Sequence, residues 1–112
     1  MKLEKPIFTG AATAIITPFK DGKVDFESYK SLIDMQIAGG IDAIVTCGTT
    51  GEGSTLTDEE DREVIKFTVD YVAGRVPVIA GTGSNDIEYA ISLTKYSEQV
   101  GADAMLLVTP YY

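Results

Sequence analysis

Several residue types that build common active sites are absent or scarce in this chain. Of its 112 residues none is His, none is Trp and only Cys47 is a cysteine. Without His there can be no Ser-His-Asp triad, imidazole base or His-ligated zinc. A single Cys excludes an internal disulfide and is typical of the reducing cytosol, so we expect a cytoplasmic protein. Proton transfer must therefore use hydroxyl, carboxyl or amino groups.

Positive charge is scarce as well. Nine Lys and Arg stand against 17 Asp and Glu, which gives a net charge of −8 at pH 7. Nucleic-acid surfaces need clustered Lys and Arg, so we expect no nucleic-acid partner. No apolar run reaches the roughly 18 residues of a membrane span, and Glu4 interrupts the basic start that a signal peptide would need. We therefore expect small-molecule or protein partners and no membrane.

The sequence does contain a regular alternation of two kinds of segment. Short runs rich in Val, Ile and Thr alternate with longer amphipathic stretches, which indicates βαβ units around a parallel sheet. The expected strands lack polar alternation and so predict burial on both faces. They cover residues 12–17, 43–46, 76–80 and 104–109.

Three helices are expected between these strands. The first covers residues 26–38, with Asp25 as N-cap and two glycines as the stop signal. The second begins at Thr57, which forms a capping-box pattern with Glu60, and ends near residue 73. The third runs from about residue 86 to Gly101. It is expected to carry Ile87, Ala90, Ile91 and Thr94 along its length.

The spacing of these units predicts the fold class. The strands begin roughly 30 residues apart, which is one βα unit, and eight such units close a (β/α)₈ TIM barrel of about 250 residues. Four strands and three helices make about half of such an α/β barrel. An open flavodoxin-like sheet is the alternative, and the number of elements alone does not exclude it.

Ligands of parallel α/β folds bind at the carboxyl ends of the strands, so the residues after each strand are the candidates for a site. In Gly48-Thr-Thr-Gly51-Glu52, glycines flank two hydroxyl groups, a pattern that suits a small carboxylate. The same residues could form a tight turn and nothing more. Tyr111 and Tyr112 follow the last strand, where a phenol can shuttle a proton or can fill an interface.

Two other polar features have structural interpretations. Asp58, Glu59, Glu60 and Asp61 resemble a metal cluster, but all four fall in the first turn of a helix, where carboxylates complement the helix dipole. Cys47 ends an apolar run and is interpreted as a small buried side chain rather than a nucleophile. We expect no metal and no cofactor.

Four motifs in order carry a resemblance to a known family. They are Thr17-Pro18, Gly48-Thr-Thr-Gly-Glu52, Pro77-Val-Ile-Ala-Gly-Thr-Gly83 and Val108-Thr-Pro-Tyr-Tyr112. Their sequence and spacing closely resemble the N-terminal part of the dihydrodipicolinate synthase family, over essentially the whole chain. The resemblance implies that residues 1–112 are the N-terminal half of a single TIM-barrel domain.

The resemblance also implies an activity. Family members are lyases of lysine (diaminopimelate) biosynthesis that condense pyruvate with L-aspartate semialdehyde through a Lys Schiff base. It implies that Thr49 and Tyr112 relay protons, that Thr50 binds the pyruvate carboxylate, and that the chain forms a homo-oligomer in which Tyr112 reaches a neighbouring subunit. A Thr at position 49 favours the synthases over the related sialic-acid lyases, which typically have Ser there.

One component of that mechanism is missing from the sequence. The Schiff base needs a desolvated Lys at the end of a barrel strand, and all seven Lys fall in predicted helices, loops or the N-terminus. In the family this Lys lies on the sixth strand, beyond Tyr112. We therefore expect the isolated chain to be inactive. The alternatives are a non-catalytic half-barrel that serves folding or assembly, and another pyruvate aldolase or lyase of the same superfamily.

Overall fold

The structure is a computed structural model that describes residues 5–112. Glu4, on which part of the signal-peptide argument rests, and Lys2 lie outside the described residues. The elements in chain order are β1 (Ala12–Ala14), β2 (Phe19–Lys20), β3 (Lys23–Val24), α1 (Phe26–Ala38), β4 (Ala43–Thr46), a 3₁₀ turn η1 (Gly53–Thr55), α2 (Asp58–Val72), β5 (Val78–Gly81), α3 (Ile87–Val100) and β6 (Ala104–Leu106).

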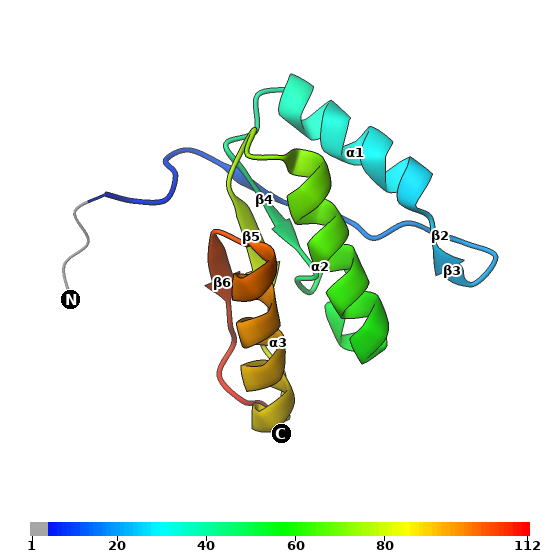
Figure 1. The fold of residues 1–112 in the computed structure, drawn as a ribbon, viewed down its shortest axis with the longest axis vertical. Coiled ribbons are helices and arrows are strands. Elements are labelled where there is room, and N and C mark those ends of the chain that lie inside the picture. The colour runs from blue at the N-terminus through cyan, green and yellow to red at the C-terminus, as the bar shows by residue number, and fades with distance from the viewer. Residues whose placement is uncertain (1–4) are drawn as a thin grey trace.

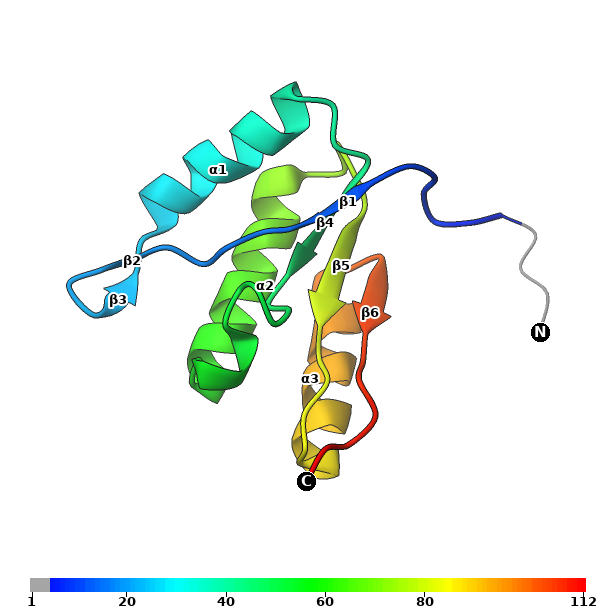
Figure 2. The ribbon, with the colours of Figure 1, turned by 180° about the vertical axis from the view of Figure 1, so that it is seen from behind.

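The main sheet is parallel and its strands follow one another in the order β1-β4-β5-β6. Figures 1 and 2 place the three helices on one face of this sheet and leave the other face open. A flavodoxin-like sheet would reverse its strand order and carry helices on both faces. Sequential parallel strands with helices on one side are the arrangement of a (β/α)₈ barrel, so the open-sheet alternative is wrong.

The strand lengths differ from expectation at both edges of the sheet. β4 has the expected bounds, but β1 stops at Ala14 and β6 at Leu106, three residues earlier than predicted in each case. An edge strand continues only as far as its neighbour. β5 ends at Gly81, so the bond from the Thr82 amide to the Leu106 carbonyl is the last between these segments. β5 also begins later than predicted, after Pro77, which has no amide hydrogen to donate.

Burial on both faces holds for the centre of the sheet but not for its edges. In β4, Ala43, Ile44 and Thr46 are buried. In β1, by contrast, Ala12 and Ala14 are exposed. The prediction therefore fails for the edge strands, whose helix-free face is uncovered.

The helix ends are set by the predicted caps. The Asp25 side chain accepts a hydrogen bond from the Ser28 amide, and Thr57 and Glu60 form a complete capping box. α3 begins after Asp86 and ends at Gly101 as expected. These caps satisfy backbone groups that the helices leave unpaired.

The buried face of α3 overlaps the expected apolar stripe only in part, at Ala90 and the half-buried Thr94. Ile87 and Ile91 are 58% and 46% exposed, whereas Leu93 and Ser97 are buried together with Ala90. Both stripes have helical spacing, and the one that meets the sheet is Ala90-Leu93-Ser97. Ile87 and Ile91 line an apolar groove together with Leu107, Val108 and Pro110 of the segment that follows β6.

A two-stranded hairpin formed by β2 and β3 was not predicted. Phe19 pairs with Val24 and Lys20 with Lys23. The turn between them is Asp21-Gly22, and both residues have positive φ, at 53° and 76°. Asp-Gly is a strong signal for such tight hairpin turns, so this element could have been found from the sequence.

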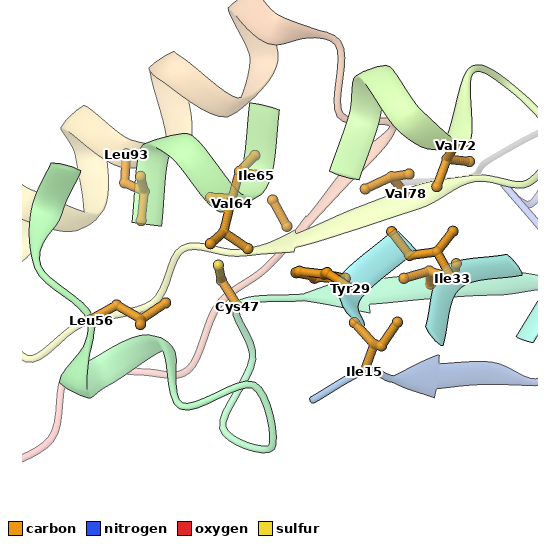
Figure 3. Close-up of a cluster of buried hydrophobic side chains, with 12 residues drawn as sticks. Ile15, Tyr29, Ile33, Cys47, Leu56, Val64, Ile65, Val72, Val78 and Leu93 are labelled. Carbon is orange, nitrogen blue, oxygen red and sulfur yellow. The ribbon is translucent and has the colours of Figure 1, made fainter. Parts of the chain in front are cut away.

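The hydrophobic core fills the space between the sheet and its helices. Ile33 of α1, Ile65 and Val72 of α2, Leu93 of α3 and Val78 of β5 are almost completely buried in one cluster (Figure 3). α1 and α2 also contact each other through Phe26 and Phe67, whose ring centres are 4.6 Å apart. Within residues 5–112 no helix has the length and apolar character that a membrane crossing requires.

Candidate active site

A cavity of about 720 Å³ opens at the carboxyl ends of β4, β5 and β6. Segments that are distant in sequence meet there, as expected for the strand ends of a parallel sheet. Its walls include Gly48 and Thr49 after β4, Gly83 after β5, and Val108 and Tyr111 after β6. Three of the four motifs quoted from the sequence therefore line one cavity.

The turn after β4 is closed by its own backbone. The Glu52 amide donates to the Thr49 carbonyl at 3.0 Å, and the Gly53 amide donates to the Gly48 carbonyl at 3.1 Å. Thr49 and Thr50 are exposed, and within residues 5–112 neither hydroxyl has a hydrogen-bond partner. Thr49 lines the cavity, whereas Thr50 does not. Both hydroxyl groups are available to a ligand.

The two tyrosines at the end of the chain differ in position. Tyr111 lines the cavity and is 38% exposed, whereas Tyr112 is fully exposed and does not line it. Their rings meet edge to face with centres 5.4 Å apart. Thr49 and Tyr111 thus line one cavity, whereas Thr50 and Tyr112 lie outside its wall.

Cys47 is buried, as predicted, and shapes the entrance to this turn. Its φ is 56°, a left-handed conformation that is uncommon for a residue other than glycine. A Cβ atom added to Gly81 would lie 2.4 Å from the Cys47 carbonyl oxygen. The backbones at the ends of β4 and β5 are therefore so close that only glycine fits at position 81 without a shift. Burial raises the pKa of the Cys47 thiol, so the side chain is not a ready nucleophile.

Asp61 departs from the helix-dipole interpretation of the acidic turn. Its side chain is 3% exposed, lines the cavity and accepts a hydrogen bond from the Tyr89 hydroxyl at 2.5 Å. Its second oxygen, Oδ1, has no hydrogen-bond partner within residues 5–112. Burial raises the pKa of this carboxyl to about 6, and the negative charges of Asp58 and Glu60 add to the effect.

Sequence reasoning missed the Asp61–Tyr89 pair, although one signal was present. Asp61 stands three and four residues before Val64 and Ile65, on the stripe that faces the core. Burial and the neighbouring carboxylate raise the pKa of the Tyr89 hydroxyl. The pair joins α2 to α3 across the floor of the cavity.

The described residues offer no metal cluster and no amine at this cavity. Within residues 5–112 no group of three or more acidic, His or Cys side chains could hold a metal ion. The residues that line the cavity include neither Lys nor Arg. Lys5 precedes β1, and the other described lysines lie on the hairpin or on helices: Lys20, Lys23, Lys30, Lys66 and Lys95. The site therefore offers hydroxyl groups, backbone amides, the Asn85 carboxamide and one carboxyl.

Comparison with known proteins gives consistent matches along the chain. The sequence model of the dihydrodipicolinate synthetase family matches residues 7–112. The 4-hydroxy-tetrahydrodipicolinate synthase of Acetivibrio thermocellus is 61% identical over 110 residues, which make up 98% of this chain and 38% of that protein.

Solved structures agree in fold as well as in sequence. The crystal structure of dihydrodipicolinate synthase from Aquifex aeolicus has a TM-score of 0.91 at 52% identity, over 94% of this chain and 36% of that one. The chloride-inhibited enzyme of Acinetobacter baumannii, in complex with pyruvate, has a TM-score of 0.88 at 51% identity, over 92% and 36%. The chain spans little more than a third of the length of these relatives.

Proposed function

Because the chain belongs to the dihydrodipicolinate synthetase family, we propose that it forms the N-terminal half of the TIM-barrel domain of a 4-hydroxy-tetrahydrodipicolinate synthase. That enzyme condenses pyruvate with L-aspartate 4-semialdehyde in lysine biosynthesis. One observation carries the proposal: the Gly48–Glu52 motif and Tyr111 converge on a single strand-end cavity. The 61% identity to an enzyme of that name supports it.

In this proposal Thr50 and Thr49 have different roles. Thr50 binds the pyruvate carboxylate, because an exposed hydroxyl without a partner can donate a hydrogen bond to an anion. Thr49 relays a proton, since a hydroxyl both accepts and donates, and its place in the cavity wall brings it to the ligand. Tyr112 provides the second hydroxyl of the relay.

The covalent step belongs to a Lys that follows Tyr112 in the complete enzyme. Its neutral amine attacks the ketone carbon of pyruvate, water leaves, and a Schiff base remains. The absence of Lys from the described cavity wall supports this assignment. The isolated chain is then half of a class I aldolase site and does not turn over by itself.

Tyr112 is also the residue through which we propose an oligomeric enzyme, because the Val108–Tyr112 motif resembles that of the family. Its ring is fully exposed and contacts only Tyr111 among the aromatic side chains of residues 5–112. We propose that it enters the site of a neighbouring subunit in a cytoplasmic homo-oligomer, a dimer of dimers.

Reconstitution tests the proposal. The chain is mixed with the remaining C-terminal part of the Acetivibrio thermocellus relative, and condensation of the two substrates is measured. We expect activity from the mixture and none from the chain alone. Thr49→Val should lower the rate more than about tenfold, because the isosteric side chain cannot relay a proton.

The matched control is Thr9→Val, an exposed threonine before β1 that should leave the rate unchanged. Unaltered activity of Thr49→Val would disprove the relay. Borohydride treatment with pyruvate should leave the mass of the isolated chain at 12.0 kDa. An adduct would show that one of its own lysines reacts and would contradict the proposed place of the nucleophile.

A further inference from the structure

We propose that Thr17 is a positioning residue, whose hydroxyl holds the Gly48–Glu52 turn in the place where Thr49 meets the cavity. Thr17 lies after β1, does not line the cavity and hydrogen-bonds to the Gly51 backbone of the turn. The importance of the turn to a reaction rests on the proposed function. The contact itself rests only on the geometry of β1 and the turn.

The contact joins two segments that are distant in sequence. The Thr17 side chain is 3% exposed, and its Oγ1 donates a hydrogen bond to the Gly51 carbonyl oxygen at 2.7 Å. Gly51 is itself buried, so water cannot readily replace this donor. Within residues 5–112 no other side chain is hydrogen-bonded to the backbone of residues 48–51.

The turn packs tightly against the segment that follows β1. A Cβ atom added to Gly51 would lie 3.0 Å from the Ile15 carbonyl oxygen and 3.3 Å from the Thr17 hydroxyl. The backbone next to Thr17 is held as well, because the Pro18 carbonyl accepts a hydrogen bond from the Asp25 amide at 2.8 Å. The donor is therefore fixed between β1 and the start of α1.

The restraint on Gly51 also limits the position of Thr49, because both residues belong to the same turn. The bond from the Glu52 amide to the Thr49 carbonyl closes a tight turn that contains Gly51. The Thr49 side chain has no hydrogen bond of its own within residues 5–112. Its location consequently depends on the turn backbone. Two side-chain hydroxyls bond that backbone: Thr55, from the same loop, donates to the Glu52 carbonyl at 3.0 Å, and Thr17 ties the turn to the segment that follows β1.

Amide hydrogen exchange on the whole chain tests this role. Thr17→Val keeps the shape of the side chain and removes the donor, whereas Thr17→Ser restores it. In Thr17→Val we expect the protection of the Glu52 and Gly53 amides to fall about tenfold more than that of the Ile44 amide, which reports on the sheet. Thr17→Ser should recover the turn to within about threefold of the original chain.

Thr68→Val is the matched control. It removes an equally buried hydroxyl from α2 and should lower protection of the turn and of the sheet alike. Equal loss at Glu52, Gly53 and Ile44 in Thr17→Val would overturn the proposal, and so would failure of Thr17→Ser to recover the turn.

The reconstituted enzyme supplies a second readout. Thr17→Val should lower kcat while Thr17→Ser restores it, with the expressed chain equally folded in both. A kcat unchanged by Thr17→Val would overturn the positioning role. If the unaltered reconstituted protein shows no condensation at all, the proposed function fails, and hydrogen exchange alone decides the role of Thr17.

Discussion

Two groups of hydroxyl side chains lie a few residues apart in this fold and have opposite properties. Tyr29, Thr46 and Thr68 are completely buried and bonded to one another, at 2.7 Å, 3.2 Å and 3.3 Å. Thr49 and Thr50 are exposed and have no partner within residues 5–112. Hydroxyls that satisfy each other hold α1, β4 and α2 together, and unsatisfied ones can meet a ligand.

The transition between the two groups takes place at Cys47. Thr46 still points into the helix-covered core, and the left-handed backbone of Cys47 then turns the chain out of the sheet. Such a conformation is costly for a residue with a side chain and persists because its surroundings enforce it. The change of chain direction at Cys47 therefore lies between the buried hydroxyl of Thr46 and the accessible hydroxyls of Thr49 and Thr50.

The largest effect is expected at the Cys47 boundary between the two groups of hydroxyls, where the ends of β4 and β5 are in contact. In Gly81→Ala the new Cβ meets the Cys47 backbone, which cannot move aside as a flexible side chain would. We expect the free energy of unfolding to fall by about 3 kcal/mol, measured by urea denaturation. Gly48→Ala is the control, since its Cβ meets only the Val45 side chain at 3.4 Å. Equal losses in both variants would contradict the close approach.

Asp61 belongs to neither group, because it is buried and only one of its oxygens is paired. Its pKa is raised to about 6 in the folded chain, so the folded state binds the proton more tightly than the unfolded state. The stability it contributes is full below about pH 4 and is lost as pH rises through 6. With partial solvent screening we expect a change of about 2 kcal/mol.

Urea denaturation between pH 4 and 8 measures this effect in the original chain and in Asp61→Asn. Asp25 and Asp34, whose carboxyl pKa values are lowered by hydrogen bonds from Ser28 and Tyr71, oppose it in both proteins. Their contribution cancels in the difference. We expect that difference to shrink as the pH falls, and a difference independent of pH would refute the assignment.

A smaller loss is expected within the buried group itself. Thr46→Val removes the hydroxyl at 2.7 Å from Tyr29, and Tyr29 keeps only the more distant Thr68 as a partner. The free energy of unfolding should fall by about 1 kcal/mol. Combining it with Tyr29→Phe in a double-mutant cycle should give a loss clearly smaller than the sum of the two single losses. Additive losses would mean that the three hydroxyls do not form a network.

The smallest effect is expected at the exposed pair. Thr49→Val and Thr50→Val remove hydroxyls that bond nothing within residues 5–112, so each should change the free energy of unfolding by less than about 0.5 kcal/mol. The same urea denaturation measures this. A loss above about 1 kcal/mol would place these side chains in the structural group and remove the contrast.

The parts of the fold that could be predicted depend on local signals. The bounds of α1 and β4 and the caps at Asp25 and Thr57 were correct, because caps and apolar runs act within a few residues. The ends of β1 and β6 were not, since an edge strand can pair no further than its neighbour extends. The buried stripe of α3 depends on how the helix crosses the sheet, and sequence spacing does not contain that information.

The candidate site divides in the same way. The rule that ligands bind at strand ends correctly predicts that the Gly48–Glu52 turn and the segment after β6 meet at one cavity. The contact from Thr17 to Gly51 and the pair formed by Asp61 and Tyr89 join residues that lie far apart in the sequence. Sequence patterns do not indicate which distant residues become partners. Only the packing of the helices and strands brings these residues together.

The sequential order of the sheet has a consequence for how the chain reaches its fold. Each strand pairs with the strand before it: Ala43 with Ala12, Val78 with Ile44, and Ala104 with Ile79. No pairing has to wait for a segment further along the chain, so every unit can dock as soon as it leaves the ribosome. The sheet can grow strand by strand from its N-terminus, because β1, β4 and β5 each offer an open edge to the strand that follows in the order β1-β4-β5-β6.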